Sequence, residues 1–198
     1  MNVAGSDRSL SRLNTEPVEP QMGAMENVSA LASAKPMVED QIPPISARVT
    51  TPSSGAGNLP GLDAVQSRYA RIIAKAARTY GLPIRGCEVA IVTAIVESNI
   101  RVYANKYVAE SLKYPHDAVG SDHDSVGIFQ QRPIYWGTVK DCMDPTTSAG
   151  KFYAALKKVA GWQNVSVGTA AQKVQKSAFP LRYDQQASKA TAICRAAY

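Results

Sequence analysis

The stretch Thr93–Ile100, "TAIVESNI", is an apolar run that ends in a carboxylate. Its first residues continue an apolar segment before it, which is typical of a helix buried in a core. Glu97 follows directly, with a serine and an asparagine behind it. Because a buried carboxylate is costly unless it is paired or protonated, Glu97 either escapes to water at the helix end or has a functional reason for its burial.

Four residues share a helical face with Glu97, and all of them are small. They lie three, four, seven and eleven positions before it: Ala94, Thr93, Ala90 and Gly86. The small face indicates open space beside the carboxyl, or another backbone packed closely against it. A carboxyl beside open space at the end of a buried helix can have its pKa raised toward neutrality, which a general acid requires. The alternative is a glutamate that points into water or caps a neighbouring helix.

Helical spacing of apolar residues marks the segments around this stretch. A first helix is predicted from Asp63 to Tyr80, where "GLP" at residues 81–83 ends it. The second helix, from about Arg85 to Ser98, is apolar nearly all round, as a buried central helix would be. Residues 100–140 have scattered aromatics and glycines without a helical period, and they predict loops with short strands.

Further helices are predicted after residue 140. Asp144 before Pro145 has the pattern of an N-cap followed by a proline in the first turn. Thr169 is predicted to cap a helix that runs to Ser177, and Asp184 to cap the last one. Helices, a small β or loop insert and more helices together predict an α+β fold that is mainly α.

The first 61 residues differ in composition from the rest. They hold 7 of the 12 prolines and show no sustained period. We therefore expect a disordered tail or linker in residues 1–61 and a single domain in residues 62–198. The N-terminus lacks the apolar segment of a secretory signal, and no stretch of about 18 apolar residues exists. If the protein acts outside a cell, something other than a standard signal takes it there, or the chain is not the full precursor.

Charge is divided unevenly along the chain. Residues 1–62 carry 4 basic and 6 acidic side chains, a net charge of −2, whereas residues 63–198 carry 18 basic and 10 acidic, a net charge of +8. A basic domain suits a polyanionic partner, such as nucleic acid or an anionic cell-wall polymer, and a solvated basic surface is the plainer explanation. No nucleic-acid-binding motif accompanies the charge, so we expect no nucleic-acid partner.

The cysteines, Cys87, Cys142 and Cys194, are widely spaced and form no CxxC pair, so a zinc site is not expected. Cys87 and Cys194 lie in apolar helical patterns and are most simply buried thiols, while one disulfide with one thiol left over is the alternative. His116 and His123, with neighbouring aspartates, fit no metal-ligand spacing. We expect neither a metal nor a cofactor.

The segment Gly120–Pro133, "GSDHDSVGIFQQRP", is the second candidate for a functional site. Gly127 follows two acidic residues, Asp122 and Asp124, and the pattern predicts a turn that leads into a short strand carrying Gln130. The Gln130 amide is both a donor and an acceptor, which suits an N-acetyl group or sugar hydroxyls.

"ESN" at the end of the buried helix, "SVGIFQ" some thirty residues later, and the helix that begins near Asp144 together resemble the lysozyme-like superfamily. The match is nearest to the lytic transglycosylases and to peptidoglycan hydrolases of actinobacteria and their phages, and it covers about residues 63–183. The Ala-Tyr-Asn-like motif of that family is absent. The corresponding segment reads "TAAQKVQKSAFPLRY", in which Gln175 or Tyr183 is the candidate for the substrate-facing role.

The resemblance implies cleavage of the β-1,4 bond between N-acetylmuramic acid and N-acetylglucosamine in peptidoglycan. Glu97 would be the catalytic acid, with Ser98 and Gln130 as substrate-binding residues. Asp122 is the candidate second carboxylate: with it the enzyme would be a hydrolase, and without one a lytic transglycosylase that forms a 1,6-anhydro end. Alternatively, Asp122 and Asp124 stabilise the loop turn through their own backbone.

The lack of a signal peptide and the proline-rich tail favour a phage-borne glycosidase, in a virion or a lysis protein, acting at the bacterial cell wall. The tail would then contact other virion proteins, and no membrane partner is expected. A bacterial wall enzyme exported by another route is the alternative origin. A non-catalytic cell-wall-binding or virion structural module with the same fold is the second class of function, and a nucleic-acid-binding protein, supported by charge alone, is the third.

Overall fold

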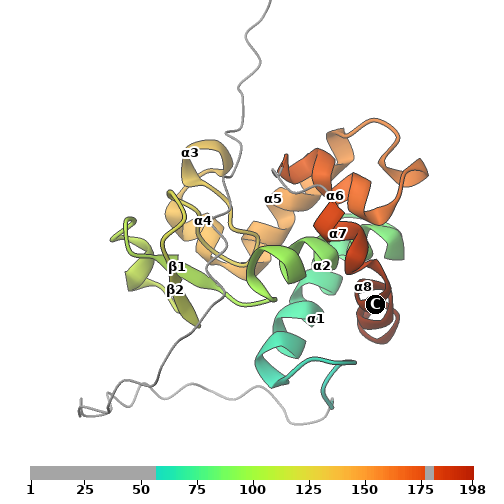
Figure 1. The fold of residues 1–198 in the computed structure, drawn as a ribbon, viewed down its shortest axis with the longest axis horizontal. Coiled ribbons are helices and arrows are strands. Elements are labelled where there is room, and N and C mark those ends of the chain that lie inside the picture. Colours follow the sequence, from blue (N-terminus) through green and yellow to red (C-terminus); the bar gives the residue numbers. More distant parts are fainter. Residues whose placement is uncertain (1–56, 177–180) are drawn as a thin grey trace, which may run out of the picture.

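The computed structural model describes residues 57–176 and 181–198, which form a mainly helical fold with one small sheet, as predicted (Figure 1). The expected disorder of residues 1–61 concerns a segment that lies almost entirely outside the described residues. In chain order the elements are α1 (Ala64–Thr79), α2 (Ile84–Ser98), β1 (Tyr103–Asn105), η1 (Ser111–Lys113), β2 (Ala118–Gly120), α3 (Pro133–Trp136), α4 (Val139–Met143), α5 (Pro145–Lys158), η2 (Trp162–Asn164), α6 (Val167–Gln175), α7 (Leu181–Gln185) and α8 (Ala187–Ala197). No helix within these ranges is both long and apolar enough to cross a membrane.

Helix α2 is the centre of the domain. Figure 1 shows it between the strands with α3 and α4 on one side and α6, α7 and α8 on the other. Every residue from Val89 to Ala94 is fully buried, which confirms the predicted buried helix. The small face that leads to Glu97 is itself packed, since Ala94, Ala90 and Gly86 are all buried and α6, α7 and α8 lie against α2. Small side chains there allow close approach of these helices.

Two helices begin with side-chain caps, of which the cap at Asp144 was predicted from the sequence. Asp63 accepts a hydrogen bond from the Gln66 backbone N–H (2.9 Å), and the Gln66 side chain accepts one in return from the Asp63 N–H (3.1 Å), a capping box for α1. Asp144 accepts from the Thr147 N–H (2.7 Å) at the start of α5. The Asp144 cap depends on neighbouring residues only, which is why its local pattern is enough to predict it.

Two other predicted caps are wrong. The N-cap of α6 is Ser166, whose hydroxyl oxygen accepts from the Thr169 N–H (3.0 Å), so the helix begins before Thr169 instead of at it. Asp184 lies inside α7 and does not cap α8. Its carboxylate instead accepts a hydrogen bond from the Gly168 backbone N–H in α6. This contact joins two different segments, so no local sequence pattern predicts it. The predicted end of α6 at Ser177 lies outside the described residues.

The insert between α2 and α5 contains a short parallel strand pair, with Tyr103 opposite Ala118 in β1 and β2. The expected strand at Gln130 is absent from this described segment. Gln130 has a positive φ of 47° and lies in a turn closed by a bridge between Val126 and Gln131. The turn replaces the strand because the backbone reverses at once after Gly127.

Gly127 is required in that turn for two reasons. Its φ is +77°, a conformation that glycine adopts without steric penalty. A Cβ atom at this position would also lie 1.9 Å from the carbonyl oxygen of Cys142, at the end of α4. The turn backbone therefore packs directly on the α4 backbone, and no other residue fits there.

A disulfide joins α2 to α8 through Cys87 and Cys194, which are 107 residues apart in the sequence. The simpler prediction of two buried thiols is therefore wrong, and the alternative of one disulfide with one thiol left over describes the chain. Cys142 is the free thiol, and burial raises its pKa to about 11, so it is a poor nucleophile near neutral pH.

Packing begins slightly before the predicted domain boundary. Leu59 is 4% exposed and belongs to the core, and its N–H donates to the Ser67 hydroxyl oxygen (2.9 Å). The Leu62 N–H donates back to the Leu59 carbonyl (3.1 Å). A domain that starts at residue 62 would lack these contacts.

We expect a chain that begins at residue 58 to keep the free energy of unfolding of the full-length protein, because Leu59 and its contacts remain. A chain that begins at residue 62 should be less stable by about 2 kcal/mol, the free energy of burying one leucine side chain. Urea unfolding of the three chains measures both effects. Unfolding of the chain that begins at residue 58 would show that the removed segment contributes to the core.

Candidate active site

Glu97 lies in the last turn of α2, where the chain leaves the helix abruptly. The next two residues after Ser98, Asn99 and Ile100, both have left-handed backbone, with φ of 52° and 55°. Such a backbone is strained for a β-branched residue by roughly 1–3 kcal/mol, and Ile100 is nevertheless held there by full burial and by its N–H bond to the Ala94 carbonyl (2.9 Å). The sharp exit places the partly buried Glu97 carboxyl at the helix end.

Two neutral side chains bind the Glu97 carboxyl. The Tyr183 hydroxyl of α7 donates a hydrogen bond to its Oε1, and the side chain of Gln175, the last residue of α6, hydrogen-bonds it as well. The pKa of Glu97 is raised from the usual 4.5 to about 7. Burial is the largest cause of the rise and the negative charge of Asp122 adds to it, while the bonds from Tyr183 and Gln175 and the charge of Arg182 lower the pKa. Arg182 is a site residue that the sequence reasoning missed; its position directly before Tyr183 is the only signal.

The turn after Gly127 is tied to the same place. The Ser98 hydroxyl donates to the Ile128 carbonyl (2.6 Å), and the Gln175 side-chain amide donates to the Phe129 carbonyl (2.9 Å). Ser98 is 5% exposed. Its hydroxyl joins the turn to the end of α2, and the role in substrate binding stays a prediction.

Gln130 is partly buried beside this junction. Its side-chain amide donates to the carbonyl of Gly127 within its own turn (2.9 Å). One donor of the amide that we expected to meet a sugar is thus used to hold the turn. The side chain remains close to the segment that contacts Gln175, so a substrate role for Gln130 stays a prediction.

The two aspartates before the turn have different partners. Asp124 forms an ion pair with Arg132, which fixes it as a structural group. The Asp122 carboxylate lies 2.7 Å from His123 Nδ1, with 41% of its side chain exposed, and it is near enough to Glu97 to affect the pKa of that carboxyl. The two aspartates therefore differ. Asp122 is exposed to solvent near Glu97, whereas Asp124 is held in its ion pair with Arg132.

A buried asparagine holds the loop that carries Asp122. The Asn105 side-chain amide at the end of β1 lies 2.9–3.1 Å from the carbonyls of Asp122, His123 and Ser125. Asn105 is fully buried and was not predicted as a site residue. Its signal in the sequence is weak: asparagine is uncommon in strands, and a buried one usually hydrogen-bonds the backbone of another segment.

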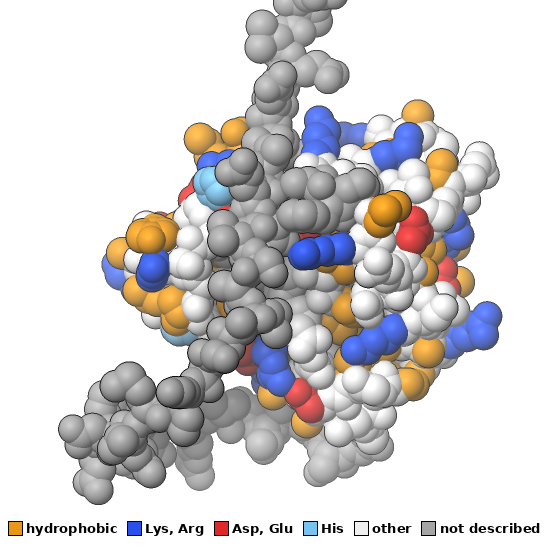
Figure 2. Space-filling view, in the orientation of Figure 1, with side chains coloured by type: hydrophobic (Ala, Val, Ile, Leu, Met, Phe, Trp, Pro, Cys, Tyr) orange, Lys and Arg blue, Asp and Glu red, His pale blue; other side chains and the backbone are white. Residues whose placement is uncertain are grey.

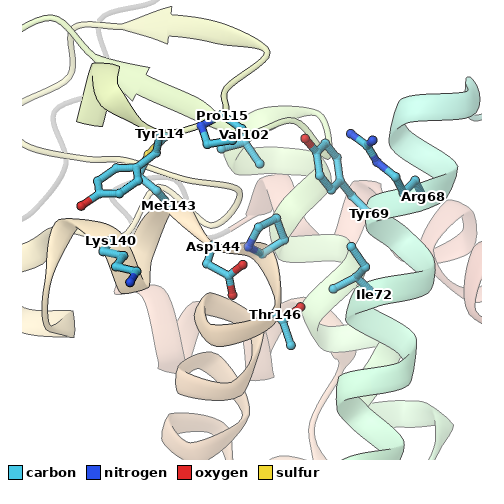
Figure 3. A pocket seen from close by; sticks show the side chains of 11 residues that line it. Arg68, Tyr69, Ile72, Val102, Tyr114, Pro115, Lys140, Met143, Asp144 and Thr146 are labelled. Carbon is cyan, nitrogen blue, oxygen red and sulfur yellow. The ribbon is translucent and has the colours of Figure 1, made fainter. Parts of the chain in front are cut away.

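A pocket of about 450 Å³ lies elsewhere in the domain (Figure 3). It is lined by residues of α1, of the loops after α2, of α4 and of the start of α5: Arg68, Tyr69, Ile72, Val102, Tyr114, Pro115, Lys140, Met143, Asp144, Pro145 and Thr146. Neither Glu97 nor any residue that contacts its carboxyl lines this pocket. It is therefore separate from the candidate active site.

Within residues 57–176 and 181–198, no group of three or more His, Cys, Asp or Glu side chains is arranged to hold a metal ion. The surroundings of Glu97 suit a proton donor. Two neutral side chains, Tyr183 and Gln175, hydrogen-bond the carboxyl, and the charges of Asp122 and Arg182 act on it from farther away. A carboxyl with a pKa of about 7 is half protonated at neutral pH, which suits general acid catalysis.

Comparison of the chain with protein-family models gives no match, and a search of the curated proteins finds none either. The chemistry of the site is therefore inferred from the residues that surround Glu97.

The raised pKa of Glu97 should make stability depend on pH. The folded state binds the proton more tightly than the unfolded chain, so this contribution to stability is full below pH 4.5 and is lost as the pH rises to about 7. Glu97→Gln stays neutral throughout. Between pH 4 and pH 8, we expect the stability of the variant relative to wild type to increase by about 2 kcal/mol, discounted for partial exposure of the carboxyl.

Urea unfolding of both proteins at pH 4 and pH 8 measures this difference. The Asp144→Ala variant, which removes a carboxylate remote from Glu97, is the control and should show no such gain at pH 8. An equal difference between Glu97→Gln and wild type at the two pH values would contradict a raised pKa.

Proposed function

We propose that residues 58–198 form a lysozyme-like domain that cleaves peptidoglycan at the β-1,4 bond between N-acetylmuramic acid and N-acetylglucosamine. One observation carries the proposal: Glu97, at the end of a buried helix, is a carboxyl whose pKa is raised to about 7 among neutral donors. Glycoside cleavage needs a carboxylic acid that is still protonated near neutral pH. The resemblance of "ESN" and "SVGIFQ" to lysozyme-like enzymes supplies the substrate class.

In the proposed reaction, protonated Glu97 gives its proton to the glycosidic oxygen as the bond to the muramic acid ring breaks. An oxocarbenium-like state develops on that ring. The Glu97 carboxylate that results is stabilised by the hydrogen bonds from Tyr183 and Gln175 and by the charge of Arg182. These groups therefore bind the charged form that develops during proton transfer more strongly than the neutral form.

Two second steps are chemically possible. With a second carboxylate as nucleophile or base, water completes a hydrolysis. Without one, the Glu97 carboxylate removes the proton of the sugar 6-hydroxyl, whose oxygen bonds to the ring carbon and closes a 1,6-anhydro product. We favour the transglycosylase route, since Asp122 is exposed and already paired with His123. A hydrolase that uses Asp122 is the alternative.

The proposed partner is the glycan strand of the bacterial cell wall, and we propose a phage virion or lysis protein as the setting. The net charge of +8 on residues 63–198 suits anionic wall polymers. Figure 2 shows Lys and Arg side chains scattered over the visible described surface, with acidic ones between them. A scattered distribution favours general attraction to a polyanion over a nucleic-acid groove.

The alternative function is a non-catalytic wall-binding or virion structural module of the same fold. Such a module would not need the strained exit after α2 or the bonds from Tyr183 and Gln175 that surround a partly buried carboxyl. Retention on purified peptidoglycan sacculi without any release of soluble fragments would favour this alternative.

Glu97→Gln should remain folded and lose wall cleavage by roughly a hundredfold or more, because the amide is nearly isosteric but cannot donate the proton. Release of soluble fragments from purified sacculi measures the rate. Asp124→Asn is the matched control, since Asp124 is an acidic residue of the same region that is committed to Arg132. A Glu97→Gln variant with most of the wild-type rate would remove Glu97 from the mechanism.

Asp122→Asn distinguishes the two second steps. On the favoured transglycosylase route, activity falls only a few-fold, and mass spectrometry of the products finds 1,6-anhydro ends. On the hydrolase route, activity falls nearly as far as in Glu97→Gln, and the products of the wild-type enzyme carry reducing ends. Reducing ends together with an inactive Asp122→Asn protein would reject the transglycosylase assignment.

A further inference from the structure

Asp184 joins α7 to the first turn of α6. Its Oδ1 accepts a hydrogen bond from the Gly168 backbone N–H (3.0 Å), and its Oδ2 accepts one from the Ser166 hydroxyl (3.2 Å). The first N–H groups of a helix lack partners within the helix and carry partial positive charge. A carboxylate from another segment is therefore a favourable acceptor at this position.

Gly168 allows this contact. A Cβ atom there would lie 2.4 Å from the Asp184 Cγ and 2.5 Å from the Asp184 backbone nitrogen. Gly168 does not have a positive φ, so its backbone conformation alone would accept another residue. Glycine is needed because the α7 backbone packs directly on the start of α6, and a larger residue would push α7 away.

Helix α7 has only five residues, and a helix that short is not stable on its own. Contacts with other segments must fix its position. Tyr183, which is fully buried and donates to Glu97, directly precedes Asp184 in this helix. The bonds of Asp184 therefore fix the backbone from which the Tyr183 side chain reaches the carboxyl.

We propose that Asp184 is a positioning residue for the candidate active site: bound to Ser166 and Gly168, it holds α7 so that the Tyr183 hydroxyl contacts Glu97. Asp184 acts through Tyr183 and takes no part in proton transfer. Its importance for catalysis rests on the proposed function, whereas the contact that it maintains is a property of the folded domain.

The contact has a measurable effect on Glu97. The groups that act on this carboxyl are Tyr183 and Arg182 from α7, Gln175 from α6 and Asp122 from the loop before the turn. The bond from Tyr183 lowers the pKa of Glu97 against the effect of burial. Loss of that bond should therefore raise the pKa, and Tyr183→Phe, which removes only the hydroxyl, gives the size of the effect.

The experiment is a titration of the Glu97 carboxyl by carbon-13 NMR in the full chain, with Glu97→Gln used to assign the signal. Tyr183→Phe should move the midpoint upward by about one pH unit. Asp184→Ala should move it upward by at least half as much. Asp184→Asn, which keeps an oxygen that can accept the Gly168 N–H, should restore most of the wild-type midpoint.

Asp144→Ala is the control, since it removes an equivalent helix cap from α5 without touching α7. It should lower stability and leave the Glu97 midpoint unchanged. Gly168→Ala disturbs the same contact from the α6 side and serves as the second variant if Asp184→Ala does not fold. It should raise the midpoint as Asp184→Ala does.

A folded Asp184→Ala or Gly168→Ala protein with the wild-type midpoint, while Tyr183→Phe shifts it, would overturn the proposal. So would a Tyr183→Phe protein without any shift, because Asp184 would then have nothing to act through. The titration uses no substrate, so a failure to cleave peptidoglycan would reject the proposed function and leave this test intact.

Discussion

The hydrogen bond from the Tyr183 hydroxyl to Glu97 is the interaction on which the site depends. Burial alone would leave the carboxyl protonated well above neutral pH, and full exposure would leave it ionised. Neutral donors from α6 and α7 moderate the effect of burial, so that the pKa lies at about 7. The same donors stabilise the carboxylate once the proton has left, which is what a carboxyl that alternates between acid and base needs.

Contacts between segments far apart in the sequence hold together the helices and the turn around that bond. The disulfide between Cys87 and Cys194 fixes α8 to α2, and α8 follows α7 after one residue. The Gln175 side chain joins α6 to the turn after Gly127 through the Phe129 carbonyl. That turn packs so closely on α4 that a side chain at Gly127 would overlap the backbone of Cys142. The site is thus assembled from five helices and one turn, and each of these contacts is long-range.

Local signals in the sequence predict the main helices and mark Glu97 as the candidate acid. The remaining features depend on contacts between distant segments. The periodicity of α1 and α2, the cap at Asp144 and the small face leading to Glu97 could be predicted from the sequence, because they depend on residues a few turns apart at most. The choice of Ser166 over Thr169 as a cap, the reach of Asp184 to Gly168, and the pairing of the cysteines depend on segments brought together only in the folded chain. Gln130 was expected in a strand because it follows two apolar residues after a predicted turn, and its positive φ of 47° is uncommon for glutamine and has no local signal in the sequence.

The most direct test of the account joins the state of Glu97 to the proposed reaction in one measurement: the pH dependence of the rate at which the wild-type protein releases fragments from purified sacculi. If Glu97 is the general acid, the rate falls as the pH rises through about 7, by about tenfold for each further unit, as the protonated fraction declines. A rate that stays constant up to pH 9 would contradict the account, because a carboxyl with this pKa would then be ionised throughout the active range.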